Sequence, residues 1–295
     1  MRYHGYKLLF RLLTFIPWWL LEFISRCIAV SLHRVLRYRR AVVYDNLRRS
    51  FPECSPKETE AIARDFYRHL AYQLISAPKL LSQSEADIRQ RHLLLEGLEV
   101  FEELELDRRK ICIVMMGHCG NWELFSAGQV YFGPLGYQQE QLYRPLSNEV
   151  LDRVLREMRS RYGSLTTPKA DIGRRIIQLL RGEVERPHIL AFIADQTPRP
   201  SVSKVWAHFL GRPTAFLDGA ERLARKYDLP VVYMDIEYLG PSKYRGRMQL
   251  ISSTPRMTVE GEITLKYVAL LEQTIRRAPA YWLWSHKRWK LIPQA

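Results

Sequence analysis

The stretch "ICIVMMGHCGNWE", residues 111–123, changes character halfway along. Residues 111–117 form a short apolar run without charged side chains, which is typical of a strand buried on both faces. His118 follows at once, and Gly117 and Gly120 give the backbone the freedom for a tight corner. Glu123 then stands where a helix is expected to begin. The stretch therefore predicts a strand, a turn and a helix, with two chemically active side chains near the turn.

Similar runs at residues 189–195 and 231–237 predict further buried strands. Between the strands, helical spacing of apolar residues occurs at residues 148–161, 171–181 and 215–227. This alternation predicts an α/β fold with a mostly parallel central sheet flanked by helices. Functional groups in such folds gather at the carboxyl edge of the sheet, so His118 and Asp195, which both stand at strand ends, could lie near each other.

A boundary is expected close to residue 50. Ser55 is a capping residue, Pro56 stands at the first helical position and Glu58 follows three residues after the cap, so a helix should begin here and run towards Pro78. The preceding "FPECSP" marks the division. We therefore expect a membrane-anchoring helical segment at residues 1–50 and a globular domain at residues 51–295.

The first fifty residues have a membrane pattern. Ten bases face only two acids there, and they flank an apolar segment at residues 12–32 that contains Trp18 and Trp19. The segment is about as long as a spanning helix, but Glu22 and Arg26 would be costly at the bilayer centre unless they pair four residues apart. A tilted span, an interfacial helix and a buried amphipathic helix of a soluble domain all stay open. No small-residue cleavage site follows, so a signal peptide is not expected.

The charge of the whole chain favours an anionic partner. Lysine and arginine total 45 against 31 acids, which gives a net charge of +14. Nucleic acid, phospholipid headgroups and a phosphorylated substrate all fit this charge. The four cysteines lack zinc or redox spacing, so reduced thiols are expected, and no metal or other cofactor is called for.

His118 and Glu123 suggest general-base chemistry. On one continuous helix they would point apart, but a corner at residues 117–120 could fold the carboxylate back onto the imidazole. A carboxylate that holds one ring nitrogen fixes the tautomer and leaves the other nitrogen free to take a proton from a hydroxyl. This spacing also arises by chance, as a strand-end histidine and an acid near a helix N-terminus.

Six blocks in fixed order make the pattern more specific. They are "GHCGNWE", "YRPLSN", "RSRYG", "ADQTP", "FLGRPTAFLDGAERLARKYDLPVV" and "PAYWLWSHKRWK". In these blocks the chain resembles the bacterial late acyltransferases of lipid A biosynthesis, in the lysophospholipid-acyltransferase-like superfamily. The resemblance implies an enzyme on the cytoplasmic face of a bacterial inner membrane. It would move a fatty acyl chain from acyl carrier protein to a hydroxyl of a phosphorylated glycolipid, and residues 51–295 would be its catalytic domain.

The resemblance also implies roles for single residues. His118 matches the catalytic histidine of the family and Glu123 matches the acid of its His-x4-Asp/Glu motif. Arg161 corresponds approximately to an arginine ahead of the third block, although Arg159 leaves that assignment open. Asp195 matches the first aspartate of the Asp-His/Gln-Asp block, where this chain has Thr197 at the third position.

Further substrate contacts are expected around this pair. Backbone N–H groups near Asn121, at the start of the predicted helix, could bind the oxyanion of acyl transfer. Arg144 and Arg161 are candidates for phosphate or carrier-protein contacts, with ordinary surface salt bridges as the alternative. Asp195 and Gln196 could position substrate or could form a structural turn. Asn148 is expected to cap a helix.

Other functions compete with this one. The acceptor could be a lysophospholipid, an aminolipid or a mannosylated lipid. Cys119 could be the nucleophile of a hydrolase, although neighbouring residues on a strand point to opposite faces. The aromatic and basic residues of "YWLWSHKRWK", residues 281–290, could stack on nucleic acid or anchor the chain at the lipid headgroups. We favour the membrane anchor and expect no nucleic-acid partner.

Overall fold

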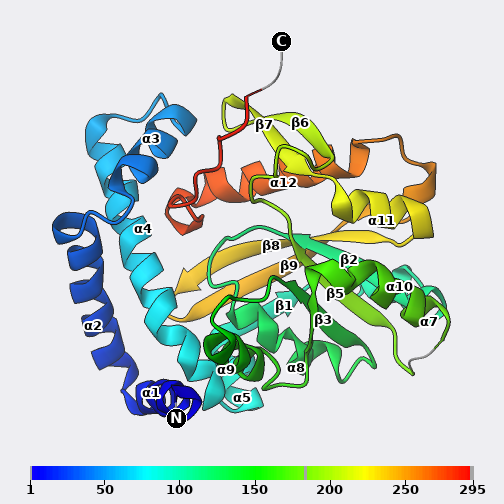
Figure 1. The fold of residues 1–295 in the computed structure, drawn as a ribbon, viewed down its shortest axis with the longest axis horizontal. Coiled ribbons are helices and arrows are strands. Elements are labelled where there is room, and N and C mark those ends of the chain that lie inside the picture. The colour runs from blue at the N-terminus through cyan, green and yellow to red at the C-terminus, as the bar shows by residue number, and fades with distance from the viewer. Residues whose placement is uncertain (1, 183–184, 293–295) are drawn as a thin grey trace.

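A seven-stranded mixed sheet forms the centre of the computed structural model, which describes residues 2–182 and 185–292. The strand order is β1-β9-β8-β2-β5-β3-β4, and β6 and β7 form a separate antiparallel pair (Figure 1). Strands β8, β2, β5, β3 and β4 run parallel, whereas β9 and β1 run the other way. The strands are β1 (Leu93–Glu96), β2 (Ile111–Met116), β3 (Gln138–Tyr143), β4 (Leu165–Pro168), β5 (His188–Ile193), β6 (Lys204–Phe209), β7 (Arg212–Leu217), β8 (Val231–Gly240) and β9 (Lys243–Ser252).

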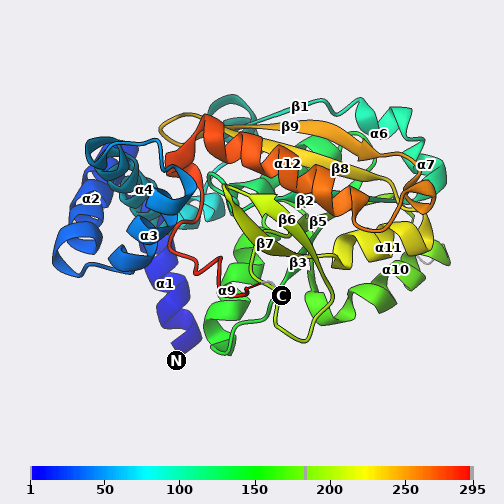
Figure 2. The same ribbon diagram turned by 90° about the horizontal axis from the view of Figure 1, so that it is seen from above.

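Helices flank this sheet. They are α1 (Arg2–Phe15), α2 (Trp18–Val30), α3 (Arg40–Ser50), α4 (Pro56–Ser76), α5 (Glu85–Asp87), α6 (Val100–Glu103), α7 (Leu106–Arg109), α8 (Gln129–Phe132), α9 (Glu149–Arg159), α10 (Ile172–Leu180), α11 (Gly219–Tyr227) and α12 (Glu262–Arg277). Helices α1 to α4 gather at one end of the molecule, on the left in Figures 1 and 2. The predicted α/β fold with a mostly parallel sheet is confirmed.

Most predicted elements are present. The strands expected from residues 111, 189 and 231 are β2, β5 and β8, and the helices expected from residues 148 and 171 are α9 and α10. Helix α4 begins as predicted, with the Ser55 and Glu58 side chains exchanging the hydrogen bonds of a capping box. The helix predicted at residues 215–227 is wrong in its first part. Residues 215–217 end β7 because they pair with β6, and α11 begins only at Gly219.

The N-terminal apolar segment is not one helix. Pro17 separates α1 from α2, since proline lacks an N–H and cannot continue a helix in the middle. Among residues 2–182 and 185–292, no helix combines the length and apolar character needed to cross a membrane. The spanning alternative for residues 12–32 is therefore unsupported. The predicted pair within α2 is confirmed, because Arg26 Nη2 lies 3.0 Å from Glu22 Oε1.

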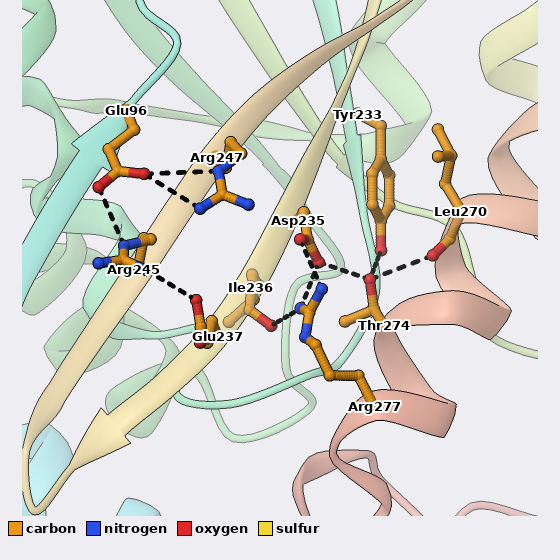
Figure 3. Close-up of polar contacts among 10 residues, drawn as sticks. All are labelled: Glu96, Tyr233, Asp235, Ile236, Glu237, Arg245, Arg247, Leu270, Thr274 and Arg277. Carbon is orange, nitrogen blue, oxygen red and sulfur yellow. Dashed lines mark hydrogen bonds and ion pairs between the residues drawn. The ribbon is translucent and has the colours of Figure 1, made fainter.

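Helix α12 is tied to the sheet by a polar network (Figure 3). Arg277 donates from both terminal nitrogens to the Asp235 carboxylate of β8, at 3.0 and 2.8 Å. Thr274 donates to Asp235 Oδ1 at 2.6 Å and also bonds the hydroxyl of the buried Tyr233. These contacts fix the end of α12 against β8, and the segment that follows α12 reaches the carboxyl end of β5, where Trp282 contacts Asp195.

Candidate active site

His118 and Asp195 meet at the carboxyl edge of two neighbouring strands. Strands β2 and β5 are parallel and pair Met116 with Ile193, so residues two positions after each strand end lie side by side. His118 Nδ1 lies 2.5 Å from Asp195 Oδ1, and the His118 main-chain N–H donates to Asp195 Oδ2 at 2.8 Å. The predicted proximity of the two strand ends is confirmed.

Two glycines make room for this corner. A Cβ on Gly117 would lie 2.5 Å from Leu271 and 3.4 Å from Asp195 Oδ2. Gly120 has a φ of +54°, and a Cβ there would lie 2.9 Å from Ile236 Cγ2. A larger residue at either position would displace the core or strain the backbone, so the corner depends on glycine.

Asp195 is a buried carboxylate with several donors. Its side chain is 3% exposed, and Trp282 donates its indole N–H to Oδ2 at 2.8 Å. Burial alone would raise the pKa of Asp195, but the His118 imidazole and the hydrogen bonds outweigh burial and lower it to about 2. Burial also disfavours the imidazolium, yet the carboxylates of Asp195 and Glu123 raise the pKa of His118 above its ordinary value. The two residues therefore form a strongly coupled acid–base pair.

Glu123 does not form the predicted hydrogen bond with His118 and binds Arg159 instead. Arg159, at the end of α9, donates Nε and Nη2 to the two Glu123 oxygens at 2.8 and 2.7 Å. The His118 Nδ1 position is taken by Asp195, so the expected hydrogen bond is wrong for this arrangement. A planar guanidinium matches both oxygens of a carboxylate at once, which an imidazole cannot do. Glu123 acts on His118 through its charge rather than through contact.

Gln196 lies next to the histidine. Gln196 Nε2 is 3.3 Å from His118 Nε2, so the amide can donate to this nitrogen when His118 carries its proton on Nδ1. Asn121 is buried and its Oδ1 accepts from the Leu124 N–H at 3.3 Å. The helix expected after the corner is a 3-10 helix, Leu124–Gly128, followed by α8. Gly120 N–H is taken by Tyr281 O.

Arg144 and Arg161 lie outside this cluster. Arg144 is exposed on the loop after β3. Arg161 lines a cavity of about 490 Å³ together with Arg11 and Phe15 of α1 and Val154 of α9. Arg159 rather than Arg161 is the arginine that contacts Glu123. Asn148 caps α9 as expected, because its side chain accepts from the Leu151 N–H.

Cys119 is poorly suited to be a nucleophile. Its side chain is 4% exposed, and burial raises the pKa of its thiol well above the ordinary value. A thiolate is the reactive form of cysteine, so this environment disfavours the hydrolase alternative. All four cysteines are free thiols.

The aromatic and basic segment at residues 281–290 belongs to the site, and the predicted membrane anchor is wrong for its largest side chains. Trp282, Trp284 and Arg288 are 3%, 0% and 1% exposed, and they donate hydrogen bonds to Asp195, Pro279 O and Ala215 O respectively. The His286 ring bonds the main chain and hydroxyl of Thr197. Sequence reasoning missed Trp282 as a site residue. The sequence feature that could have indicated it is the block "PAYWLWSHKRWK", which was interpreted as a membrane-surface feature.

The chain matches known proteins along nearly its whole length. The sequence model of a family described as bacterial lipid A biosynthesis acyltransferase matches residues 4–291. The chain is similar to the lipid A biosynthesis palmitoleoyltransferase of Escherichia coli (strain K12), at 25% identity over 284 residues that cover 94% of this chain and 87% of the relative. Its similarity to the lipid A biosynthesis acyltransferase of Shigella flexneri has the same extent. The N-terminal helices and the C-terminal segment are both within these matches.

Proposed function

The chain belongs to the bacterial lipid A biosynthesis acyltransferase family and is an acyltransferase, and we propose that it moves a fatty acyl chain from acyl carrier protein to a hydroxyl of a lipid A precursor. The observation that carries the proposal is the His118–Asp195 pair at the sheet edge. The buried Asp195 carboxylate holds His118 Nδ1, while 14% of the His118 side chain stays exposed. This leaves Nε2 as a base that a lipid hydroxyl can reach.

The reaction then needs one base and no covalent enzyme intermediate. His118 Nε2 removes the proton of the acceptor hydroxyl, and the oxygen attacks the thioester carbonyl. The tetrahedral oxyanion collapses, the carbon–sulfur bond breaks, and the thiolate leaves and takes up the proton. Asp195 stabilises the imidazolium that forms between these steps. Glu123, held by Arg159, adds negative charge beside the histidine.

Oxyanion stabilisation is proposed for the corner itself. The N–H groups of Gly120 and Leu124 are already occupied, by Tyr281 O and by Asn121. This narrows the candidate donors to the main chain of residues 121–123 between them, close to His118. Fixed donors aimed at the developing charge are among the largest contributions to acyl transfer.

Arg144 and Arg161 are proposed contacts for phosphate on the acceptor or on the carrier protein. The cavity lined by Arg11 and Arg161 combines two guanidinium groups and the Glu157 carboxylate with the apolar side chains Phe15, Leu81 and Val154. This combination suits an acceptor that carries phosphate and hydrocarbon side by side.

Membrane association is proposed through the N-terminal helices. Phe15, Trp19 and Phe23 are 81%, 71% and 61% exposed, and Val35 and Leu36 are 73% and 67% exposed. Val35 ends a π-helical turn, Ser31–Val35, and the neighbouring arginines Arg34 and Arg37 are exposed as well. Apolar side chains bordered by cations suit an anionic membrane surface. The proposed place of action is the cytoplasmic face of a bacterial inner membrane.

Purified protein with labelled acyl carrier protein tests the proposal. We expect acyl transfer to a lipid A precursor that lacks one acyl chain, and little transfer to lysophospholipid. His118→Ala should lower kcat by about 10²–10⁴-fold while the protein stays folded. A wild-type protein that acylates only lysophospholipid would overturn the acceptor, and near-normal transfer by His118→Ala would overturn the mechanism.

A further inference from the structure

The Asp195 carboxylate receives a hydrogen bond from a residue that the proposed mechanism does not use. Trp282 donates its indole Nε1–H to Asp195 Oδ2 at 2.8 Å, in a buried position. The main-chain N–H of His118 donates to the same oxygen, while the imidazole binds the other oxygen, Oδ1. Each oxygen therefore has its own partners, and the plane of the carboxylate is fixed relative to the imidazole.

Trp282 is held in place independently of the carboxylate. Its main chain bridges to Cys119, and the preceding carbonyl, Tyr281 O, accepts from the Gly120 N–H at 2.8 Å. Its ring packs against Trp284 and Phe209, with ring centroids 4.7 and 5.9 Å away. The indole N–H therefore keeps its position when the charge on the histidine changes.

We propose that Trp282 is a positioning residue for acyl transfer, which keeps the Asp195 carboxylate ionised and aligned so that His118 carries its proton on Nδ1 and presents an unprotonated Nε2 to the acceptor hydroxyl. This inference rests on the proposed function of the site. An indole N–H is only a donor, so Trp282 binds the carboxylate and takes no part in proton transfer itself. A fixed donor stabilises the charged form of a carboxylate and spreads its charge.

The other titratable groups around the pair keep one charge state near neutral pH. Burial raises the pKa of the Cys119 thiol and of the Tyr233 and Tyr267 hydroxyls well above their ordinary values. Burial lowers the pKa of His286 to about 4 and of Arg288 to about 10, so the imidazole is neutral and the guanidinium charged. Glu123 is paired with Arg159. A change near neutral pH in the dependence of kcat/KM on pH therefore reports on the His118–Asp195 pair.

Trp282→Phe removes the N–H and keeps an aromatic ring. Loss of a hydrogen bond to a charged group predicts a kcat that is lower by about 10- to 100-fold, with KM changed by less than about 3-fold. The less stabilised carboxylate attracts the imidazolium more strongly, so the acid limb of the kcat/KM profile should move to higher pH. A limb that stays in place or moves to lower pH overturns the proposal.

The same segment supplies two matched controls. Trp284 donates its indole N–H to Pro279 O at 2.6 Å, and Trp289 donates to Thr214 Oγ1 at 2.7 Å. Trp284→Phe and Trp289→Phe remove partly buried hydrogen bonds away from Asp195 and keep an aromatic ring beside Trp282, so they should lower Tm but leave the acid limb unchanged. If Trp282→Phe behaves like these controls, Trp282 is only a packing residue and the inference fails. If wild-type protein transfers no acyl chain, the proposed function itself fails.

A closer replacement covers the case in which Trp282→Phe does not fold. Substitution of Trp282 by 3-benzothienylalanine replaces the ring N–H with sulfur and keeps the shape of the indole. The same loss of kcat and the same shift of the acid limb are expected. Wild-type kcat with an unchanged profile in this variant overturns the proposal.

Discussion

The His118 imidazole meets the Asp195 carboxylate because β2 and β5 are parallel neighbours that end in register, with Met116 opposite Ile193. The partner of the histidine is thus set by strand order in the sheet, across 77 residues of chain. Glu123, only five residues away, is held by Arg159.

The two carboxylates should differ in their effect on catalysis. Asp195→Asn cannot stabilise the imidazolium, and we expect kcat to fall by about 10²–10⁴-fold. Because Asp195 raises the pKa of His118, its loss should move the acid limb of the kcat/KM profile to lower pH. Glu123→Gln keeps a hydrogen-bonding group for Arg159, and we expect a loss nearer 10-fold. Steady-state kinetics on folded variants checks both. A larger loss in Glu123→Gln than in Asp195→Asn would reverse the assignment.

The choice between these carboxylates was not predictable from local sequence. Both residues were named as candidates, and the five-residue spacing favoured Glu123 because a glycine corner can bring it close to His118. The deciding facts are non-local: β5 lies beside β2, and α9 delivers Arg159 to Glu123. When both groups are within reach, a guanidinium binds a carboxylate better than an imidazole does, because it can donate to both oxygens.

Strands with clear apolar runs were predictable, and polar ones were not. Strand β3 has the sequence "QQEQLY" and gives no strand signal. Its polar side chains nevertheless find partners inside the fold, since Gln139 donates to Phe125 O and Glu140 binds His188 and Arg175, and only the Gln139 Oε1 atom of this pair of residues is buried without a partner. The C-terminal tryptophans were misplaced for a related reason. The same aromatic and basic residues can occur at a membrane surface or in a core where each of these indole N–H groups has a partner.

The coupling between Arg159 and Glu123 should be measurable. Their side chains are 19% and 17% exposed, so the pair is partly desolvated. A double-mutant cycle of Arg159→Met and Glu123→Gln should give a coupling of about 1–3 kcal/mol in the free energy of unfolding by urea. Arg159→Met also leaves the Glu123 charge uncompensated near His118, so the acid limb should move to higher pH. Arg156→Met is the control, because Arg156 lies on the same helix and pairs with Asp152, and an equal effect there would contradict a specific pair.

Glu140 should contribute to stability in a defined pH range. Burial alone would raise the pKa of this side chain, but hydrogen bonds from His188, Arg175 and Thr167 outweigh burial and lower it to about 2. A depressed pKa stabilises the folded state above the unfolded value of 4.5, and the contribution is lost as pH falls from there towards 2.

Glu140→Gln should therefore destabilise the protein by about 2–4 kcal/mol at neutral pH, and the difference from wild type should shrink in acid. Urea unfolding between neutral and acidic pH measures it. Asp65→Asn, at an exposed pair with Arg68, should change stability by less than about 1 kcal/mol. A difference that is constant with pH would contradict the assigned linkage.

The exposed face of α2 provides a test of membrane docking. Trp19 and Phe23 lie one helical turn apart and are both mostly exposed, whereas Leu21 on the other side of the helix is buried at 1% exposure. Trp19→Glu removes a large apolar contact and adds a negative charge. It should weaken binding to anionic vesicles by at least about 10-fold. Co-sedimentation with vesicles of phosphatidylethanolamine and phosphatidylglycerol measures this. Met257→Glu is the matched control, because Met257 is 82% exposed but lies next to α12 rather than among the N-terminal helices. Equal binding by the two variants would show that the N-terminal helices do not form the docking surface.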